Sequence, residues 1–237
     1  MSCPKAVFLD IDNTILNFDA YVRETMRQGF TELGICTFEE EMYDVFTREN
    51  HKLWQRIEQG TLTFEELQKV RWNIIFEALG LSYDGPTFER YFRAALNRSA
   101  IPEEGAEALV RFLSSRSILC SASNGPHVQQ TGRLAIAGLE PLFRYHFTSE
   151  RLGVSKPAQA FFDAAFRELN EGRSEPIRPE ECLMIGDSMT SDMAGGIGAG
   201  MRTLWYCRGS LPAELPLKPD YIVTELAQIP ELPGLWD

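Results

Sequence analysis

Short apolar runs that end in Ser, Gly or Asp alternate with longer amphipathic segments after about residue 100, and one further apolar run opens the chain at Ala6. Such runs are typical of strands that are buried on both faces, whereas the longer segments repeat their apolar residues with the period of a helix. Strands that alternate with helices form parallel sheets through right-handed crossovers. The sequence therefore predicts an α/β fold with a Rossmann-like parallel sheet.

The apolar runs and the helical periods place the elements of this sheet. The predicted strands cover residues 6–9, 117–122, 145–147, 182–185, 203–206 and 221–223. The predicted crossover helices cover residues 104–115, 128–137, 159–170 and 192–199. Each crossover is long enough to join parallel strands.

The segment at residues 17–97 departs from this alternation, because it contains several amphipathic helical patterns in succession and no strand pattern. Thr37 and Thr63 are each followed three residues later by Glu, and this capping-box pattern predicts that a helix begins at each Thr. We therefore expect an all-α helical cap at residues 17–97, inserted into an α/β core that is formed by residues 1–16 and 98–237.

Composition and charge exclude several kinds of partner. The chain of 237 residues carries a formal net charge of -11, which disfavours binding to a nucleic-acid backbone. Its five cysteines show no CxxC spacing and are accompanied by only three histidines, which disfavours a disulfide framework or a zinc site. No stretch of about 18 apolar residues is present. We therefore expect a cytoplasmic protein with no nucleic-acid and no membrane partner, and the sequence leaves the oligomeric state open.

Two carboxylates follow the first predicted strand directly. Asp10 and Asp12 are two residues apart, so their side chains leave the same side of an extended backbone. Asn13 and Thr14 then favour a turn. Taken alone, the pattern is also compatible with an ordinary turn or a helix cap.

Polar residues also follow two other predicted strands. Ser123, Asn124 and Gly125 end the second strand, and a hydroxyl, an amide and a glycine are residue types that bind phosphate. An Asn-Gly turn is the alternative there. Asp187 follows the fourth strand and Asp192 lies at the start of the next helix, where a capping role explains one of these two acids but not readily both.

These residues are expected to converge, because ligands bind at the carboxyl ends of parallel strands. Asp10, Asp12, Asp187 and Asp192 would then crowd one site, and two carboxylates 4 Å apart repel by roughly 4 kcal/mol at an effective dielectric constant of 20. A loop lysine is usually solvated, but at such a site Lys156 would supply a needed positive charge. A hard divalent ion with oxygen ligands would supply the rest, and Mg²⁺ is the expected ion beside a phosphate.

The four motifs, taken in order, resemble those of the haloacid dehalogenase superfamily, and specifically of its phosphatases with a helical cap after the first strand. The motifs are Asp10-x-Asp12-x-Thr14, Ser123-Asn124-Gly125, Lys156-Pro157 and Gly186-Asp187-x₄-Asp192. The resemblance implies that Asp10 is the nucleophile, which forms an aspartyl-phosphate, and that Asp12 is the general acid and base. It also implies that Mg²⁺ is bound by the Asp10 carboxylate, the Asp12 backbone carbonyl and Asp187.

The other motif residues are expected to have supporting roles. The phosphoryl oxygens would be held by Ser123, Asn124, Gly125 and Lys156. Asp192 is expected to pair with Lys156 or to orient a metal-bound water. Thr14, with Asn13, is expected to shape the turn and to support the acid.

The leaving group distinguishes a phosphatase from a dehalogenase. An Asp with an ordinary pKa near 3.9 is already ionised and can attack phosphorus without a base. An alkoxide leaving group needs a proton, which Asp12 can supply, and we expect other carboxylates to crowd Asp12. A halide leaves without a proton. The presence of Asp12 therefore favours a phosphatase.

The predicted cap resembles more loosely that of the house-cleaning pyrimidine 5′-nucleotidases, which act on nucleoside monophosphates. The matching stretches of the cap are residues 50–54, 59–63, 67–68 and 71–72, and residues 149–154 and 195–200 of the core also resemble that subfamily. Trp54 and Trp72 are candidates for stacking on a base, and packing inside the cap is the simpler interpretation.

The sequence thus predicts a Mg²⁺-dependent phosphomonoester hydrolase for a small-molecule phosphate ester, with nucleoside 5′-monophosphates as the favoured class. A phosphatase for a sugar phosphate or phosphoglycolate and a sugar-phosphate mutase are the alternatives with the same core. A catalytically silent ligand-binding protein is the alternative from a different class. The substrate itself stays open, because selectivity depends on cap contacts.

Overall fold

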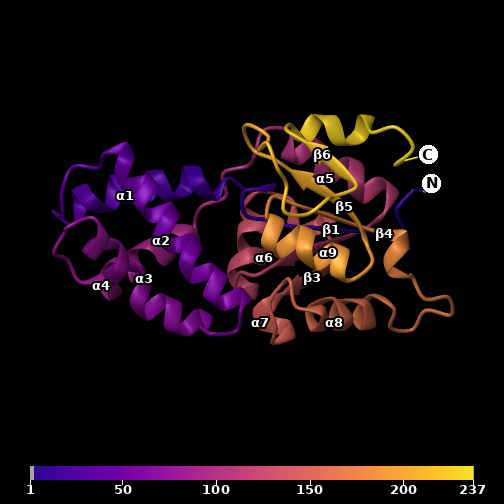
Figure 1. The fold of residues 1–237 in the computed structure, drawn as a ribbon, viewed down its shortest axis with the longest axis horizontal. Coiled ribbons are helices and arrows are strands. Elements are labelled where there is room, and N and C mark those ends of the chain that lie inside the picture. Colours follow the sequence, from indigo (N-terminus) through magenta and orange to yellow (C-terminus); the bar gives the residue numbers. More distant parts are fainter. Residues whose placement is uncertain (1–2, 237) are drawn as a thin grey trace. The chain divides into compact units, whose positions relative to one another are not determined.

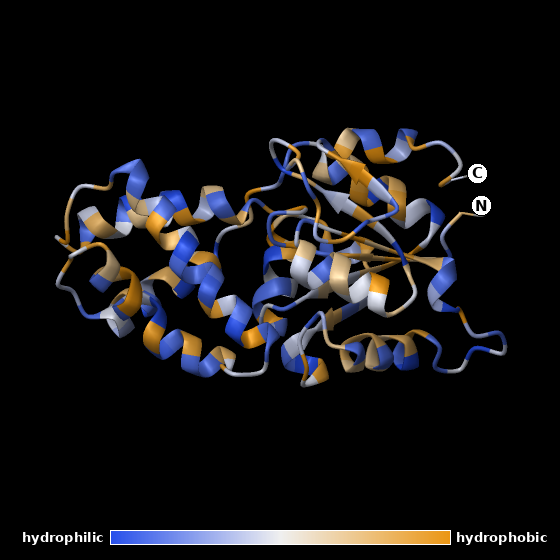
Figure 2. Cartoon of the chain, in the orientation of Figure 1, coloured by the Kyte–Doolittle hydropathy of each residue, from blue (hydrophilic) through white to orange (hydrophobic). Residues whose placement is uncertain are grey.

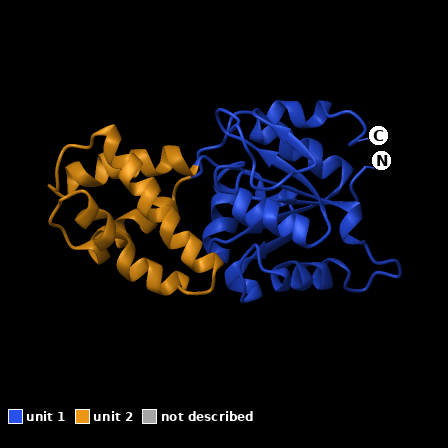
Figure 3. Cartoon of the chain, viewed as in Figure 1, with its two compact units in different colours: residues 1–17, 100–237 blue, residues 18–99 orange. Residues whose placement is uncertain are grey.

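The computed structural model describes residues 3–236 and separates them into two compact units (Figure 3). One unit is Phe18–Ser99 and contains four α-helices. The other unit contains the sheet and is formed by the parts of the chain that precede and follow Phe18–Ser99 in the sequence. No helix in the described part of the chain is long and apolar enough to cross a membrane.

The sheet has six strands in the order β3-β2-β1-β4-β5-β6 (Figure 1). They are β1 (Ala6–Leu9), β2 (Ile118–Ser123), β3 (Tyr145–Thr148), β4 (Cys182–Gly186), β5 (Arg202–Tyr206) and β6 (Tyr221–Val223). Every neighbouring pair is parallel, which confirms the predicted α/β fold. Since β1 lies between β2 and β4, the chain extends the sheet in both directions from its first strand.

Helices connect successive strands of this sheet. Between β1 and β4 they are α5 (Ala106–Arg116), α6 (His127–Ile136), η1 (Glu140–Leu142), α7 (Ser149–Leu152), α8 (Gln159–Leu169) and η2 (Pro179–Glu181). After β4 they are the π-helical turn η3 (Met189–Met193) and α9 (Ala194–Gly198), whereas η4 (Leu226–Glu231) follows the last strand.

Alternate residues of the central strand face two different hydrophobic cores. Val7 and Leu9 pack in a core with residues of α5, whereas Ala6 and Phe8 pack in a second core with residues of α8. All four side chains are 0% exposed. Because β1 is apolar on both faces, its first polar side chain, Asp10, comes only where the strand ends.

The helical unit consists of α1 (Phe18–Glu32), α2 (Glu40–Glu58), α3 (Phe64–Ala78) and α4 (Gly85–Leu96). Figure 2 shows these helices banded with hydrophilic and hydrophobic residues, as amphipathic helices are. Their apolar faces meet in an aromatic core that includes Phe30, Phe46, Trp72, Phe88 and Phe92. Trp72 is 1% exposed, so it packs inside this unit and is not available to stack on a base.

One of the two predicted capping boxes forms. At the start of α3, the Thr63 hydroxyl accepts from the Glu66 N–H, and the Glu66 carboxylate accepts from the Thr63 N–H. The prediction at Thr37 was wrong, because α2 begins at Glu40 and its N-cap, Glu39, makes no side-chain capping bond. The backbone is still extended at Glu39, and this delays the start of the helix beyond the reach of Thr37.

Replacing Trp72 by Ala is expected to lower the free energy of unfolding of the helical unit by about 3–5 kcal/mol, because it leaves a cavity in the aromatic core. The matched control is Trp54→Ala in the same unit. Trp54 is only partly buried and contacts Phe64 at a ring-centroid distance of 5.8 Å, so a smaller loss is expected. Urea unfolding followed by far-UV circular dichroism measures both, and equal losses would contradict the distinction.

Candidate active site

The residues that follow β1 and β4 lie at the same edge of the sheet. Leu9 pairs with Ile185 in parallel register, and the Asp10 N–H donates to the Ile185 carbonyl at 2.9 Å. The strand order reverses at this point, since β2 lies on one side of β1 and β4 on the other. The carboxyl edge at such a switch point is the usual ligand position of an open α/β sheet.

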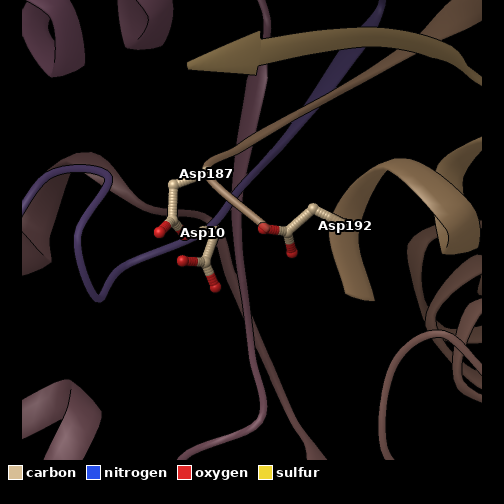
Figure 4. Close-up of side chains that lie close together, drawn as sticks. All are labelled: Asp10, Asp187 and Asp192. Atoms are coloured by element: carbon tan, nitrogen blue, oxygen red, sulfur yellow. The ribbon is translucent and has the colours of Figure 1, made fainter. Parts of the chain in front are cut away.

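Three carboxylates converge at this edge (Figure 4). One oxygen from each of Asp10, Asp187 and Asp192 lies within 4.8 Å of the others. Asp10 is 7% exposed and Asp192 is 1% exposed. Lys156 is the ammonium group bonded to this cluster, so its three carboxylates carry more negative charge than their direct cationic partner neutralises.

Lys156 joins two of these acids to the sheet. Its Nζ donates to Asp10 Oδ1 at 2.8 Å, to Asp192 Oδ1 at 2.5 Å and to the Ala122 carbonyl at 2.5 Å. An ammonium group has three N–H donors, so all of them are used inside the protein. Burial alone would lower the pKa of Lys156, but the charges of Asp10 and Asp192 raise it above its ordinary value, and the side chain stays charged.

Lys156 does not offset the whole negative charge of the three carboxylates. Burial raises the pKa of Asp10 to about 7, although the Lys156 charge opposes this effect, and Asp192 and Asp12 add to it. Burial also raises the pKa of Asp187 well above its ordinary value, and the charges of Asp10 and Asp192 raise it further. A divalent cation beside these groups would supply the missing charge.

The donor atoms suit a hard divalent cation. Mg²⁺ and Ca²⁺ prefer oxygen ligands at about 2.0–2.6 Å, so two ligands of one ion lie at most about 4–5 Å apart, in agreement with the 4.8 Å limit of the cluster. Asp192 is the least suitable ligand because both of its oxygens accept shorter hydrogen bonds, Oδ1 from Lys156 at 2.5 Å and Oδ2 from the Ser188 N–H at 3.0 Å. The two bonds to Asp10 are longer, at 2.8 Å from Lys156 and 3.3 Å from Thr14. Asp10 and Asp187 are therefore the better candidates.

Asp192 reaches the cluster because the backbone is irregular there and a glycine stands opposite. The helix predicted at residues 192–199 begins instead as the π-helical turn Met189–Met193 and continues as α9. A Cβ at Gly186 would lie 2.1 Å from Asp192 Oδ2. Any other residue at position 186 would therefore displace the carboxylate that pairs with Lys156.

Ser123 ends β2, and two donors orient its hydroxyl. Its Oγ accepts from the Gly125 N–H at 3.0 Å and from Gln130 Nε2 at 2.7 Å. A serine hydroxyl has two acceptor lone pairs and one donor, so its own O–H is left to donate to a further group. A Cβ at Gly125 would lie 2.4 Å from Gln130 Nε2, which explains the glycine of this motif.

Asn124 binds the backbone of Lys156 from both sides. Its Oδ1 accepts from the Lys156 N–H at 2.8 Å, and its Nδ2 donates to the Lys156 carbonyl at 2.9 Å. The side chain of Asn124 thus positions Lys156. Its expected contact with a phosphoryl oxygen stays a prediction.

The neighbours of Asp12 differ from the expected ones. Its Oδ1 accepts from Arg133 Nη1 at 2.5 Å and its Oδ2 accepts from Gln130 Nε2 at 2.6 Å. A cation and an amide from α6 therefore bind the carboxylate that we expected other acids to crowd. Thr14 Oγ1 donates to Asp10 Oδ2 at 3.3 Å, so Thr14 supports the first Asp of the motif.

Gln130 and Arg133 were missed by the sequence prediction. Each is 1% exposed, and with Leu134 they form the buried face of α6. Residues three and four apart share one face of a helix, so the sequence did contain a signal. Two long polar residues fall on the inward face of a helix that begins just after the motif Ser123-Asn124-Gly125, which is expected to bind phosphate.

Comparison with known proteins places this site in a family. The family model of the haloacid dehalogenase-like hydrolases matches residues 4–200. Pyrimidine 5′-nucleotidase PynA of Streptococcus pneumoniae is 33% identical over 220 residues, which cover 92% of this chain and 90% of the relative. Pyrimidine 5′-nucleotidase YjjG of Escherichia coli is 28% identical, and the match covers 95% of this chain and 96% of the relative. The crystal structure of the HAD-hydrolase YfnB of Bacillus subtilis bound to magnesium has a TM-score of 0.85 at 28% identity, and covers 97% of this chain and 98% of that one.

The chain therefore belongs to the haloacid dehalogenase-like hydrolases, and it is an enzyme of that family. The resemblance drawn from its four motifs is confirmed by similarity along most of the chain. The looser resemblance of its cap agrees with the activity for which PynA and YjjG are named.

Replacing Lys156 by Met is expected to destabilise the sheet unit by about 3–5 kcal/mol, because it leaves the carboxylates of Asp10 and Asp192 buried without their counter-charge. The measurement is urea unfolding without added divalent cations. Lys69→Met is the matched control, since Lys69 forms an exposed ion pair with Glu65, and no measurable change is expected there. A stability of Lys156→Met equal to that of the control would show that the buried pairs are not needed.

Proposed function

We propose that the enzyme is a Mg²⁺-dependent phosphomonoester hydrolase that acts through an aspartyl-phosphate on Asp10, with nucleoside 5′-monophosphates as its substrates. The position of Asp10 carries the proposal. Its carboxylate lies at the switch point of the sheet, is bonded to Lys156 and lies beside Asp187. Ser123 ends the neighbouring strand. Its hydroxyl oxygen accepts from Gly125 and Gln130, so its O–H remains to donate to a further group.

In the first step of the proposed reaction, an Asp10 oxygen attacks phosphorus. The new bond joins that oxygen to phosphorus, and the bond from phosphorus to the ester oxygen breaks. Asp12 gives a proton to the departing alkoxide. In the second step a water molecule attacks the same phosphorus, Asp12 takes a proton from that water, and the bond to Asp10 breaks. Inorganic phosphate leaves, and both carboxyl groups return to their starting states.

The other residues of the site position and balance these groups. The free O–H of Ser123 is expected to donate to a phosphoryl oxygen. Lys156 fixes one oxygen of the nucleophile and lowers the repulsion between two anions through its charge. Mg²⁺, held by Asp10, Asp187 and the Asp12 carbonyl, would when bound offset the negative charge of the phosphoryl group.

The substrate class rests on the relatives and on the cap resemblance. PynA and YjjG are named as pyrimidine 5′-nucleotidases, and both match this chain over nine-tenths or more of their length. We propose Phe18–Ser99 as the cap of the enzyme. The proposed partners are small-molecule phosphate esters, in a cytoplasmic setting where its five cysteines stay as free thiols.

Asp10→Asn is expected to lower phosphate release by about 10⁴-fold or more, because the amide is not a nucleophile toward phosphorus. Phosphate release is measured with Mg²⁺ over pyrimidine and purine nucleoside 5′-monophosphates, a hexose phosphate and phosphoglycolate. Asp163→Asn, an exposed position on α8, is the control and should keep wild-type rates. Activity in Asp10→Asn would refute the mechanism, and a clear preference for phosphoglycolate or the hexose phosphate would refute the substrate class.

Removal of divalent cations with EDTA is expected to abolish phosphate release, and Mg²⁺ should restore it. Asp187→Asn is expected to raise the Mg²⁺ concentration for half-maximal activity by about tenfold or more, because it removes a charged ligand. The Asp163→Asn control should leave that concentration unchanged. Full activity in EDTA would contradict a metal-dependent reaction.

A further inference from the structure

One amide group connects the two parts of the site that perform different steps. Gln130 Nε2 donates to Ser123 Oγ at 2.7 Å and to Asp12 Oδ2 at 2.6 Å. A side-chain amide nitrogen has two N–H donors, so both are used. The amide therefore fixes the distance between the hydroxyl expected to bind phosphate and the carboxylate expected to protonate the leaving group.

Arg133 completes this network from the same helix. Its Nη1 donates to Asp12 Oδ1 at 2.5 Å and to Gln130 Oε1 at 3.0 Å. The Arg133 side chain is 1% exposed, whereas that of Asp12 is 33% exposed. Burying a guanidinium group costs much free energy unless the group is paired and hydrogen-bonded. An arrangement in which Arg133 loses these bonds is therefore unfavourable, and the network is held in the observed geometry.

The network leaves Asp12 free to exchange a proton. A carboxylate offers about four lone-pair sites, and these two donors occupy one on each oxygen. The exposed side of the carboxylate is therefore open. Its orientation is set by α6, and the lone-pair sites that Gln130 and Arg133 do not occupy are available to a proton.

We propose that Gln130 and Arg133 are positioning residues. They hold the Asp12 carboxylate at a fixed distance and orientation from the Ser123 hydroxyl that is expected to bind phosphate. This inference rests on the proposed function. Neither residue touches the reacting atoms, and both act through Asp12. Their contribution falls on the step in which the leaving group takes a proton.

The competing explanation is structural, in which the two residues only fill and neutralise the interior of the sheet unit. Substrates with different leaving groups separate these explanations. p-Nitrophenolate is a weak base and leaves phosphorus without a proton, whereas the alkoxide of a nucleoside monophosphate needs one. A positioning role affects the second substrate selectively, and a structural role affects both alike.

The experiment compares kcat/KM for p-nitrophenyl phosphate with kcat/KM for the best nucleoside 5′-monophosphate, since this constant reports steps up to the first departure of a leaving group. The variants are Gln130→Met, which keeps volume but removes both donors, and Arg133→Met. Each is expected to lose about tenfold or more in kcat/KM for the nucleotide relative to the aryl ester, as is Asp12→Asn. Arg133→Lys should recover part of the loss.

Two controls confine the effect to this network. Gln159→Met makes the same substitution at an exposed position of α8 and should leave the ratio of the two constants unchanged. Adding Gln130→Met to Asp12→Asn should change the ratio little further, because residues that act through one group are not additive. Circular dichroism confirms folding, and Gln130→Met decides the outcome if Arg133→Met does not fold.

The outcomes separate this inference from the proposed function. No phosphate release by the wild type would refute the function itself. Selective loss in Asp12→Asn, together with equal losses on both substrates in Gln130→Met, would overturn the positioning role and leave the function intact. Selective loss in both, without further selective loss in the double variant, is the result expected.

Discussion

The buried ammonium group of Lys156 is the interaction on which the rest of the site depends. It bonds to Asp10 after β1, to the Ala122 carbonyl in β2 and to Asp192 in the turn after β4. The ends of three neighbouring strands are thus bonded to one ammonium group, and the Lys156 side chain is almost fully buried. A charge so deeply buried is tolerated only because all three of its donors are satisfied. Asn124 in turn fixes the backbone of Lys156 through two further bonds.

Close approaches of side chains explain why two motif positions are glycine. Neither Gly125 nor Gly186 has a positive φ, so backbone freedom does not account for them. At Gly125 the space of a Cβ is occupied by the amide of Gln130, and at Gly186 by the carboxylate of Asp192. Each glycine therefore belongs to a contact with a residue further along the chain. A motif read only along the strand does not reveal that contact.

The sheet could be predicted from the sequence because its strands are apolar on both faces and end abruptly in polar residues. That pattern predicts the order of elements, and it predicts that Asp10, Lys156, Asp187 and Asp192 meet at one edge of the sheet. Local signals were less reliable. The capping pattern at Thr37 failed because the helix begins later, and the helix expected at Asp192 starts with a π-helical turn. Gln130 and Arg133 were missed because periodicity marks a helix face as buried through its apolar residues, and these two are polar.

Asp10 and Asp12 are the same residue type two positions apart, yet the fold gives them opposite electrostatic surroundings. Asp10 lies beside two other carboxylates, and the charge of the three exceeds that of Lys156 and calls for a further cation. Asp12 has a fixed cation of its own in Arg133, and its side chain reaches solvent. The strand end separates them, since Asp10 continues the buried edge of β1 while Asp12 already lies in the turn beside α6. Two identical groups can perform different chemistry when their environments differ in this way. The division arises because β1 lies between β4 and β2, and β2 is followed by α6, the helix that carries the two buried polar residues.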